Sequence, residues 1–166
     1  MFVKRFVYSL CVLTVMVVIF GFSNQQSEET RKSSDILVRP IENTLKQNFY
    51  SESEKAGSWK KVKHIIVKVV RKSAHMFLFF LLAVLVFMCV DSFGVNRSLN
   101  ILCSFIFSVM YACTDEFHQL FVSGRTGRLS DVVIDMTGVC IGLILISIIN
   151  GQGKNSLRYI TILISC

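Results

Sequence analysis

The sequence predicts an all-α fold: a polytopic membrane protein with a bundle of about four transmembrane helices and a basic amphipathic helix in the membrane plane. The chain has 166 residues, 52% of them hydrophobic, and its mean hydropathy is +0.57, which is high for a soluble domain of this length. Four apolar runs each approach the roughly 20 residues that a helix needs to cross about 30 Å of hydrocarbon. None alternates polar and apolar side chains as a strand would, and a helix satisfies its own backbone in lipid.

The four spans are predicted within one membrane domain, residues 1–166. They cover about 6–22, 73–90, 99–118 and 132–149. The first span has two interpretations, because Lys4 and Arg5 precede it and Ser23 follows in a small-x-small pattern that a signal peptidase could accept. We favour a retained helix over a cleaved signal peptide, since the rest of the chain is itself embedded in the membrane.

A basic segment at about residues 59–72 predicts the in-plane helix. Residues 23–72 hold 11 of the 18 Lys and Arg residues of the chain. On a helical wheel, one side of the segment is apolar, with Trp59, Val62, Ile65, Ile66, Val69 and Val70, and the other is basic, with Lys60, Lys61, His64, Lys68, Arg71 and Lys72. This pattern is typical of a helix in the headgroups of an anionic membrane. Basic patches also bind nucleic acid, but an apolar face that leads into a span favours membrane lipids as the partner, and we expect no nucleic acid.

The positive charges point to two different topologies. Lys4 and Arg5, with three acidic residues after the first span, favour a cytoplasmic N-terminus. A count over alternate loops gives 13 Lys and Arg on the side of residues 23–72 and 114–131, against 5 on the other side, which places those loops inside. We favour the N-terminus inside, because the first helix often dominates and an in-plane helix accounts for much of the basic excess.

Polar side chains gather on one face at the end of the third predicted helix. At i, i+4, i+7 and i+8 this face carries Tyr111, Asp115, His118 and Gln119. Glu116 is expected at the edge of the same face.

The fourth helix is expected to begin at Ser130 or Asp131, because either residue is a good N-cap before the apolar run. One narrow stripe along this helix carries Asp131, Asp135, Gly138 and Gly142. The glycines allow another helix to approach closely. Arg71 and His75 share a face of the second helix, so three helices present polar groups to a common interior near one membrane boundary.

Charges at this depth are costly unless they are paired or hydrated. The available cations are Arg71, Lys72, His75 and Arg125, and the available anions are Asp115, Glu116, Asp131 and Asp135. Gly124 and Gly127 let the loop between the third and fourth helices turn back, which would place Arg125 over the cluster. The simpler alternative makes Asp131 a helix cap and Lys72 an interfacial charge.

The candidate site is compatible with more than one chemistry. Asp115, Glu116 and His75 are candidates for general acid–base catalysis, and carboxylates with a histidine can hold a divalent metal. An Arg- and Lys-rich rim also suits the binding of a phosphate or carboxylate without reaction, and buried acids can form an ion path. The sequence has no metalloprotease, nucleophile-elbow or phosphate-loop motif. Its six cysteines form no C-x-x-C pair, so we expect no metal, no disulfide framework and no cofactor.

Four segments occur in order along the chain: "FGFSNQ", "RKSAHMFLFFLL", "YACTDEFHQLFVSGR" and "DVVIDMTGVCIG". In these segments the chain resembles the VanZ-like family of bacterial integral membrane proteins. The residues that match the family pattern are Ser23, Gln25, Lys72, His75, Asp115, Glu116, Gln119, Arg125, Asp131, Asp135 and Gly138. The family often has a proline before the glycine of the loop, where this chain has Ser123.

The resemblance implies a multi-pass protein of the bacterial cytoplasmic membrane with a role in the cell envelope. The family is named for a protein that gives low-level resistance to teicoplanin, a glycopeptide antibiotic. Two hypotheses follow for this chain. In the first, the polar cluster binds an anionic lipid, a lipid-linked cell-wall precursor or a glycopeptide, and so contributes to antibiotic tolerance. In the second, the chain is a small membrane enzyme that acts on a lipid headgroup or a lipid-linked phosphate.

Overall fold

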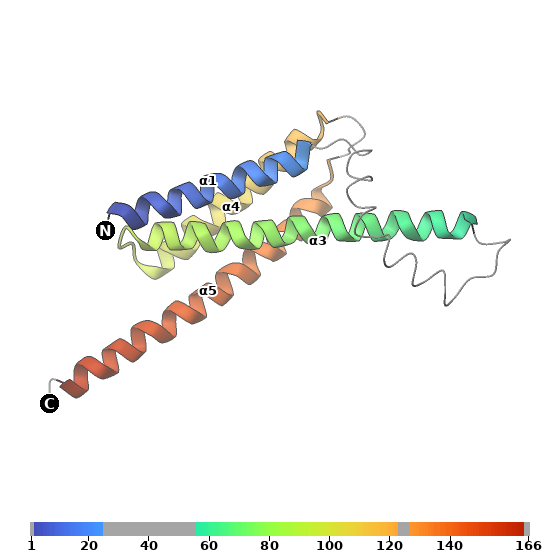
Figure 1. Ribbon diagram of the computed structural model, residues 1–166. Coiled ribbons are helices and arrows are strands. Elements are labelled where there is room, and N and C mark those ends of the chain that lie inside the picture. The colour runs from blue at the N-terminus through green and yellow to red at the C-terminus, as the bar shows by residue number, and fades with distance from the viewer. Residues whose placement is uncertain (1, 25–55, 123–126, 165–166) are drawn as a thin grey trace.

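The computed structural model describes residues 2–24, 56–122 and 127–164, which form four helices (Figure 1). The helices are α1 (Phe2–Asn24), α3 (Ala56–Asp91), α4 (Arg97–Gln119) and α5 (Leu129–Ile164). Each contains a stretch long and apolar enough to cross a membrane, at Phe2–Asn24, Ile65–Asp91, Arg97–Gln119 and Leu129–Asn150. The described ranges hold no strand, and the predicted all-α fold with four spans is confirmed.

Helix α3 is the centre of the bundle, because it contacts each of the other three helices. Helix α4 packs against α3, α5 and α1, whereas α1 and α5 share no contact within the described residues. In Figure 1, α1 and α4 lie side by side, and α5 crosses α3 at an angle before running away from the bundle. Successive spans run in opposite directions, so the end of α4 meets the start of α5 and the end of α1.

Close packing of α3 against α5 depends on the glycine stripe of α5. A Cβ atom added to Gly142 would lie 2.8 Å from the carbonyl oxygen of Phe80, and one added to Gly138 would collide with the carbonyl oxygen of Met76. The helix backbones therefore touch at these two positions, as small residues permit in membrane bundles. This contact sets Asp135 and Asp131, one and two turns before Gly138 on the same stripe, against the polar side of α3.

A short turn joins α3 to α4. Gly94 adopts a φ of +77°, a conformation that favours glycine. The amide of Gly94 donates to the carbonyl of Asp91 over 3.0 Å, and the Asn96 side chain then accepts from the amide of Leu99 over 2.8 Å. The second of these contacts is an N-cap of α4.

The hydrophobic core lies between α1, α3, α4 and α5. Its most deeply buried large side chains are Ile19, Phe79, Leu82, Phe87 and Val139. Many large apolar side chains on the outer faces are exposed, including Phe77, Met110 and Ile144. Exposed apolar faces of this kind are the expected surface of a helix bundle surrounded by lipid.

The structure differs from the predicted in-plane helix. The basic segment at 59–72 forms the beginning of α3, which continues into the span without a break. No glycine or proline occurs from residue 58 to residue 93, so nothing in the sequence separates a surface helix from a span. Figure 1 shows this part of α3 projecting straight beyond the bundle. Within the predicted apolar face, Ile65 and Val69 are more than half exposed, whereas the side chain of Trp59 lies outside the described residues.

Candidate functional site

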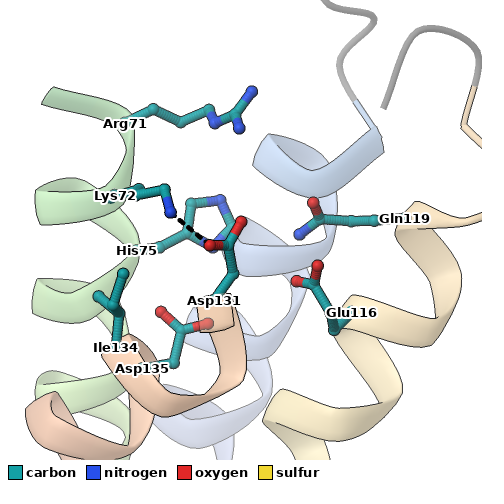
Figure 2. A pocket seen from close by; sticks show the side chains of 8 residues that line it. All are labelled: Arg71, Lys72, His75, Glu116, Gln119, Asp131, Ile134 and Asp135. Atoms are coloured by element: carbon teal, nitrogen blue, oxygen red, sulfur yellow. Dashed lines mark hydrogen bonds and ion pairs between the residues drawn. The ribbon is translucent and has the colours of Figure 1, made fainter. Parts of the chain in front are cut away.

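A small polar pocket lies between α3, α4 and α5 near one end of the spans. It is lined by Arg71, Lys72, His75, Glu116, Gln119, Asp131, Ile134 and Asp135. Figure 2 shows these side chains directed toward a common centre from the three helices. The pocket leaves about 20 Å³ for the centres of water-sized molecules, which is room for about one water molecule. We refer to these eight residues as the polar pocket.

Helix α3 supplies the basic side chains of the polar pocket. Arg71, Lys72 and His75 lie within little more than one turn, near the start of the span. Lys72 forms an ion pair with Asp131 of α5 (Figure 2). His75 is 7% exposed, and its Nδ1 lies 3.9 Å from Oδ2 of Asp115. The guanidinium of Arg71 makes no hydrogen bond or ion pair within the described ranges, and it extends over the mouth of the pocket in Figure 2.

Asp115 lies behind the polar pocket and joins three helices. Its Oδ2 accepts hydrogen bonds from the Ser23 hydroxyl over 2.9 Å and from Nε2 of Gln119 over 3.1 Å. With His75 on a third side, Asp115 connects α1, α3 and α4. Its Oδ1 is buried and has no hydrogen-bond partner within the described ranges.

Glu116 borders the pocket directly and is 6% exposed. Its Oε1 accepts a hydrogen bond of 2.5 Å from the amide of Arg128, which fixes the chain just before α5. Its Oε2 is buried and has no hydrogen-bond partner among the described residues. A buried carboxylate oxygen without a donor costs free energy, so the polar pocket is arranged to receive a hydrogen-bond donor such as water or a hydroxyl group.

Helix α5 supplies Asp131 in its first turn and Asp135 one turn later. A carboxylate in the first turn is stabilised by the positive end of the helix dipole, and Asp131 is also paired with Lys72. Asp135 is deeper, at 4% exposure, and lines the pocket. The predicted start at Ser130 or Asp131 agrees within two residues with the observed start at Leu129.

Most of the residues that the sequence singled out are brought together by the fold. Seven of the polar candidates line the pocket, and Asp115 contacts it through Gln119 and His75. Glu116, which we expected at the edge of its face, is part of the lining. His118 is not part of the lining: its ring lies tilted against the ring of Phe20, with the ring centroids 4.6 Å apart. The predicted position of Arg125 over the cluster lies outside the described residues.

Two features of the site were not anticipated. One is the hydrogen bond from Ser23 to Asp115. The signal that could have indicated it is the position of Ser23 as the first polar residue after a long apolar run. The other is a buried polar face that runs along α4 below Asp115, formed by Asn100, Ser104 and Ser108, each 0% exposed. The Asn100 amide donates to the carbonyl of Phe87 over 3.2 Å, and Ser104 donates to Asn100 over 3.1 Å. Their i, i+4, i+8 spacing within an apolar run is the signal that would have revealed this face.

The arrangement suits the binding of an anion with a water molecule or hydroxyl group beside it. Arg71 offers a guanidinium at the mouth, while Glu116 and Asp135 present carboxylates to a space of about one water molecule. Among the described residues, no group of three or more His, Cys, Asp or Glu side chains is placed to hold a metal ion. The side chains of the polar pocket offer ion pairing, hydrogen bonding and proton transfer.

The comparisons with known proteins are consistent with this structure. The family model for VanZ/LLP1 matches residues 6–150, which include every residue of the polar pocket and the four candidate spans almost in full. Comparisons with curated proteins and with solved structures find no match. Because the family match covers most of the chain, this multi-pass membrane protein belongs to the VanZ/LLP1 family.

Proposed function

We propose that the polar pocket binds the phosphate-bearing headgroup of an anionic lipid or of a lipid-linked cell-wall precursor. The observation that carries this proposal is the guanidinium of Arg71. It lies at the mouth of the pocket without a hydrogen bond or ion pair in the described part of the chain. Arginine offers several N–H donors that match phosphate oxygens, and such charge-assisted bonds are strong.

The position of Arg71 supports a lipid rather than a soluble anion. Arg71 lies six residues after the start of the second candidate span, at the level where headgroups meet hydrocarbon. Exposed apolar side chains close to this level, at Ile65, Val69 and Leu129, are available to contact acyl chains. The polar pocket has space for about one water molecule, which is too small for a sugar or a glycopeptide. The phosphate headgroup would therefore bind at the mouth of the pocket, while a water molecule or a hydroxyl group occupies the pocket itself.

The proposed role is in the envelope of a bacterial cell, in the cytoplasmic membrane. A protein that holds a lipid-linked precursor changes how much of that precursor a glycopeptide reaches, which would contribute to antibiotic tolerance. The family match and the resemblance to teicoplanin-resistance proteins support this role. Deleting the gene and measuring teicoplanin tolerance beside the lipid composition would test it, and unchanged tolerance would contradict it.

Binding is tested by native mass spectrometry of the purified chain with phosphatidylglycerol or phosphatidylcholine. We expect a preference for phosphatidylglycerol that weakens about tenfold or more in Arg71→Gln, the size expected for a lost hydrogen bond to a charged group. Lys68→Gln is the matched control, because Lys68 is an exposed lysine of the same helix outside the pocket lining. Equal binding of both lipids, or equal losses in the two variants, would contradict the proposal.

A second candidate function is hydrolysis of the bound phosphate ester. It is favoured by the buried Oε2 of Glu116, which has no hydrogen-bond partner in the described part of the chain and borders a space of about one water molecule. In this reaction Glu116 would take a proton from water as the water oxygen bonds to phosphorus. The phosphorus–oxygen bond to the leaving group breaks, and the proton passes to that oxygen. Glu116→Gln should then abolish phosphate release and keep lipid binding, whereas unchanged release in both Glu116→Gln and His75→Ala would exclude it.

A further inference from the structure

A second and larger cavity lies at the opposite end of the bundle from the polar pocket. It measures about 310 Å³, which is within the range of about 300–1,000 Å³ for ligand pockets. Its polar lining comes from Lys4 and Tyr8 of α1, Asp91 and Ser92 at the end of α3, and Asn150 of α5. We refer to it as the interfacial cavity.

The walls of the interfacial cavity are held in place by two arginine contacts. Arg5 donates from Nε to the carbonyl of Ser92 over 3.2 Å and lies 4.6 Å above the centroid of the Phe93 ring, which fixes α1 to the α3–α4 turn. Arg97 donates to the carbonyl of Ser147 and fixes α5 to the start of α4. Because α1 and α5 share no contact in their described residues, the cavity occupies the space between them beside α3.

The cavity lies at the level of lipid headgroups. Its polar residues lie near Phe2, Asp91 and Asn150, where three of the candidate spans begin or end. Met88 and Ile146 line it one turn further into the spans. Polar groups at the boundary and apolar groups beneath them match an amphipathic molecule whose headgroup stays at the interface.

The charges of the lining indicate which headgroup fits. The ammonium of Lys4 has no hydrogen bond or ion pair in the described part of the chain, and the Tyr8 hydroxyl and the Asn150 amide are further donors. Asp91 adds a carboxylate, which makes another interaction and keeps further lone pairs for hydrogen bonds. One cation and one carboxylate complement a headgroup that carries both charges.

We propose that the interfacial cavity binds a phosphoethanolamine headgroup, with its phosphate at Lys4 and Tyr8 and its primary ammonium at Asp91. A quaternary ammonium has no N–H to donate to Asp91, and a glycerol headgroup has no cation. The site therefore distinguishes phosphatidylethanolamine from phosphatidylcholine and from phosphatidylglycerol. It is independent of the polar pocket, which lies at the other membrane boundary and presents Arg71 to an anion.

The test is native mass spectrometry of the full chain carrying Arg71→Gln, so that binding at the polar pocket is weakened. We expect phosphatidylethanolamine to bind more tightly than the other two lipids. Adding Lys4→Gln should weaken it about tenfold or more, and Asp91→Asn should reduce it to the level of phosphatidylcholine. Tyr8→Phe should weaken it less, because it removes a neutral donor. Melting temperatures in lipid-free detergent show whether each variant is folded.

Two further outcomes decide the proposal. Equal binding of the three lipids, or wild-type binding in both Lys4→Gln and Asp91→Asn, would overturn it. Free O-phosphoethanolamine, tested alone, separates a lipid ligand from a soluble one: we expect it to bind far more weakly than the lipid, since Met88 and Ile146 would have no acyl chain to contact. Equally tight binding of the free headgroup would overturn the assignment to a lipid.

Discussion

The hydroxyl of Ser23 at the end of α1 donates a hydrogen bond to Asp115 at the end of α4, across 92 positions of the sequence. Both side chains are buried, with 0% and 4% exposure. The bond places the first helix behind the polar pocket, although α1 supplies no residue to its lining. The first span thus has a structural role at the charged end of the bundle.

Replacing Ser23 by alanine should destabilise the bundle by about 1 kcal/mol, since hydrogen bonds between membrane helices contribute roughly 0.6 to 2 kcal/mol. The measurement is the unfolding free energy in detergent. Ser9→Ala is the control, because the Ser9 hydroxyl is on the same helix and has only an exposed contact of 3.5 Å with the Cys89 sulfur. Equal stability of the two variants would show that the Ser23 bond contributes nothing.

The glycine stripe of α5 predicts a strong effect of added volume. Gly138→Ala would place a methyl group against the carbonyl oxygen of Met76, so α3 and α5 must separate. We expect a loss of about 1–3 kcal/mol, as for other overpacked sites, together with weaker lipid binding at the polar pocket. Gly21→Ala should be nearly neutral, because no atom of the described residues lies within 4 Å of the added atom. The measurement is the melting temperature of the two variants. Equal shifts in melting temperature would contradict the predicted close contact at Gly138.

The ion pair between Lys72 and Asp131 should couple α3 to α5 measurably. The two side chains are 32% and 17% exposed, so we expect a coupling free energy of about 0.5–1 kcal/mol in a double-mutant cycle with alanine. The coupling should decrease at high salt. The same cycle on Arg71 and Asp131 is the control, as no ion pair joins these residues within the described ranges. A larger coupling free energy between Arg71 and Asp131 than between Lys72 and Asp131 would contradict the ion pair of Lys72.

The charges next to the first span predict the orientation of the bundle. With Lys4 and Arg5 in the cytoplasm, the polar pocket faces the outside of the cell membrane and the interfacial cavity faces the cytoplasm. Reporter fusions after Gly57 and after Gly127 should then both give an external signal. A cytoplasmic signal from both fusions would reverse the orientation.

The four spans could be predicted because hydropathy and length alone determine them. The glycine stripe with Asp131 and Asp135 was also predictable, since a period of 3.6 places these residues on one side of a helix. The structure adds that Gly138 and Gly142 meet backbone atoms of α3. The pattern gives the face of one helix, but the identity of its partner depends on the packing of the whole bundle.

The form of the basic segment could not be predicted from its amphipathic pattern. A helical wheel for 59–72 describes one helix, and it says nothing about whether that helix bends at its end. The buried face at Asn100, Ser104 and Ser108 was missed for a related reason. The i, i+4, i+8 spacing places these small polar residues on one face of the helix, but only their burial and the contact with the Phe87 carbonyl show that this face is turned inward.

The unbroken course of α3 has a mechanical consequence. Nine residues, 56–64, precede the apolar stretch of this helix, and at about 1.5 Å per residue they form an arm of roughly 14 Å beyond the membrane boundary. Without a hinge between the arm and Arg71, a torque applied to the arm turns the whole helix. The arm and the residues Arg71, Lys72 and His75 thus share one helix axis, so the direction of the arm and the placement of these side chains against α5 are set together.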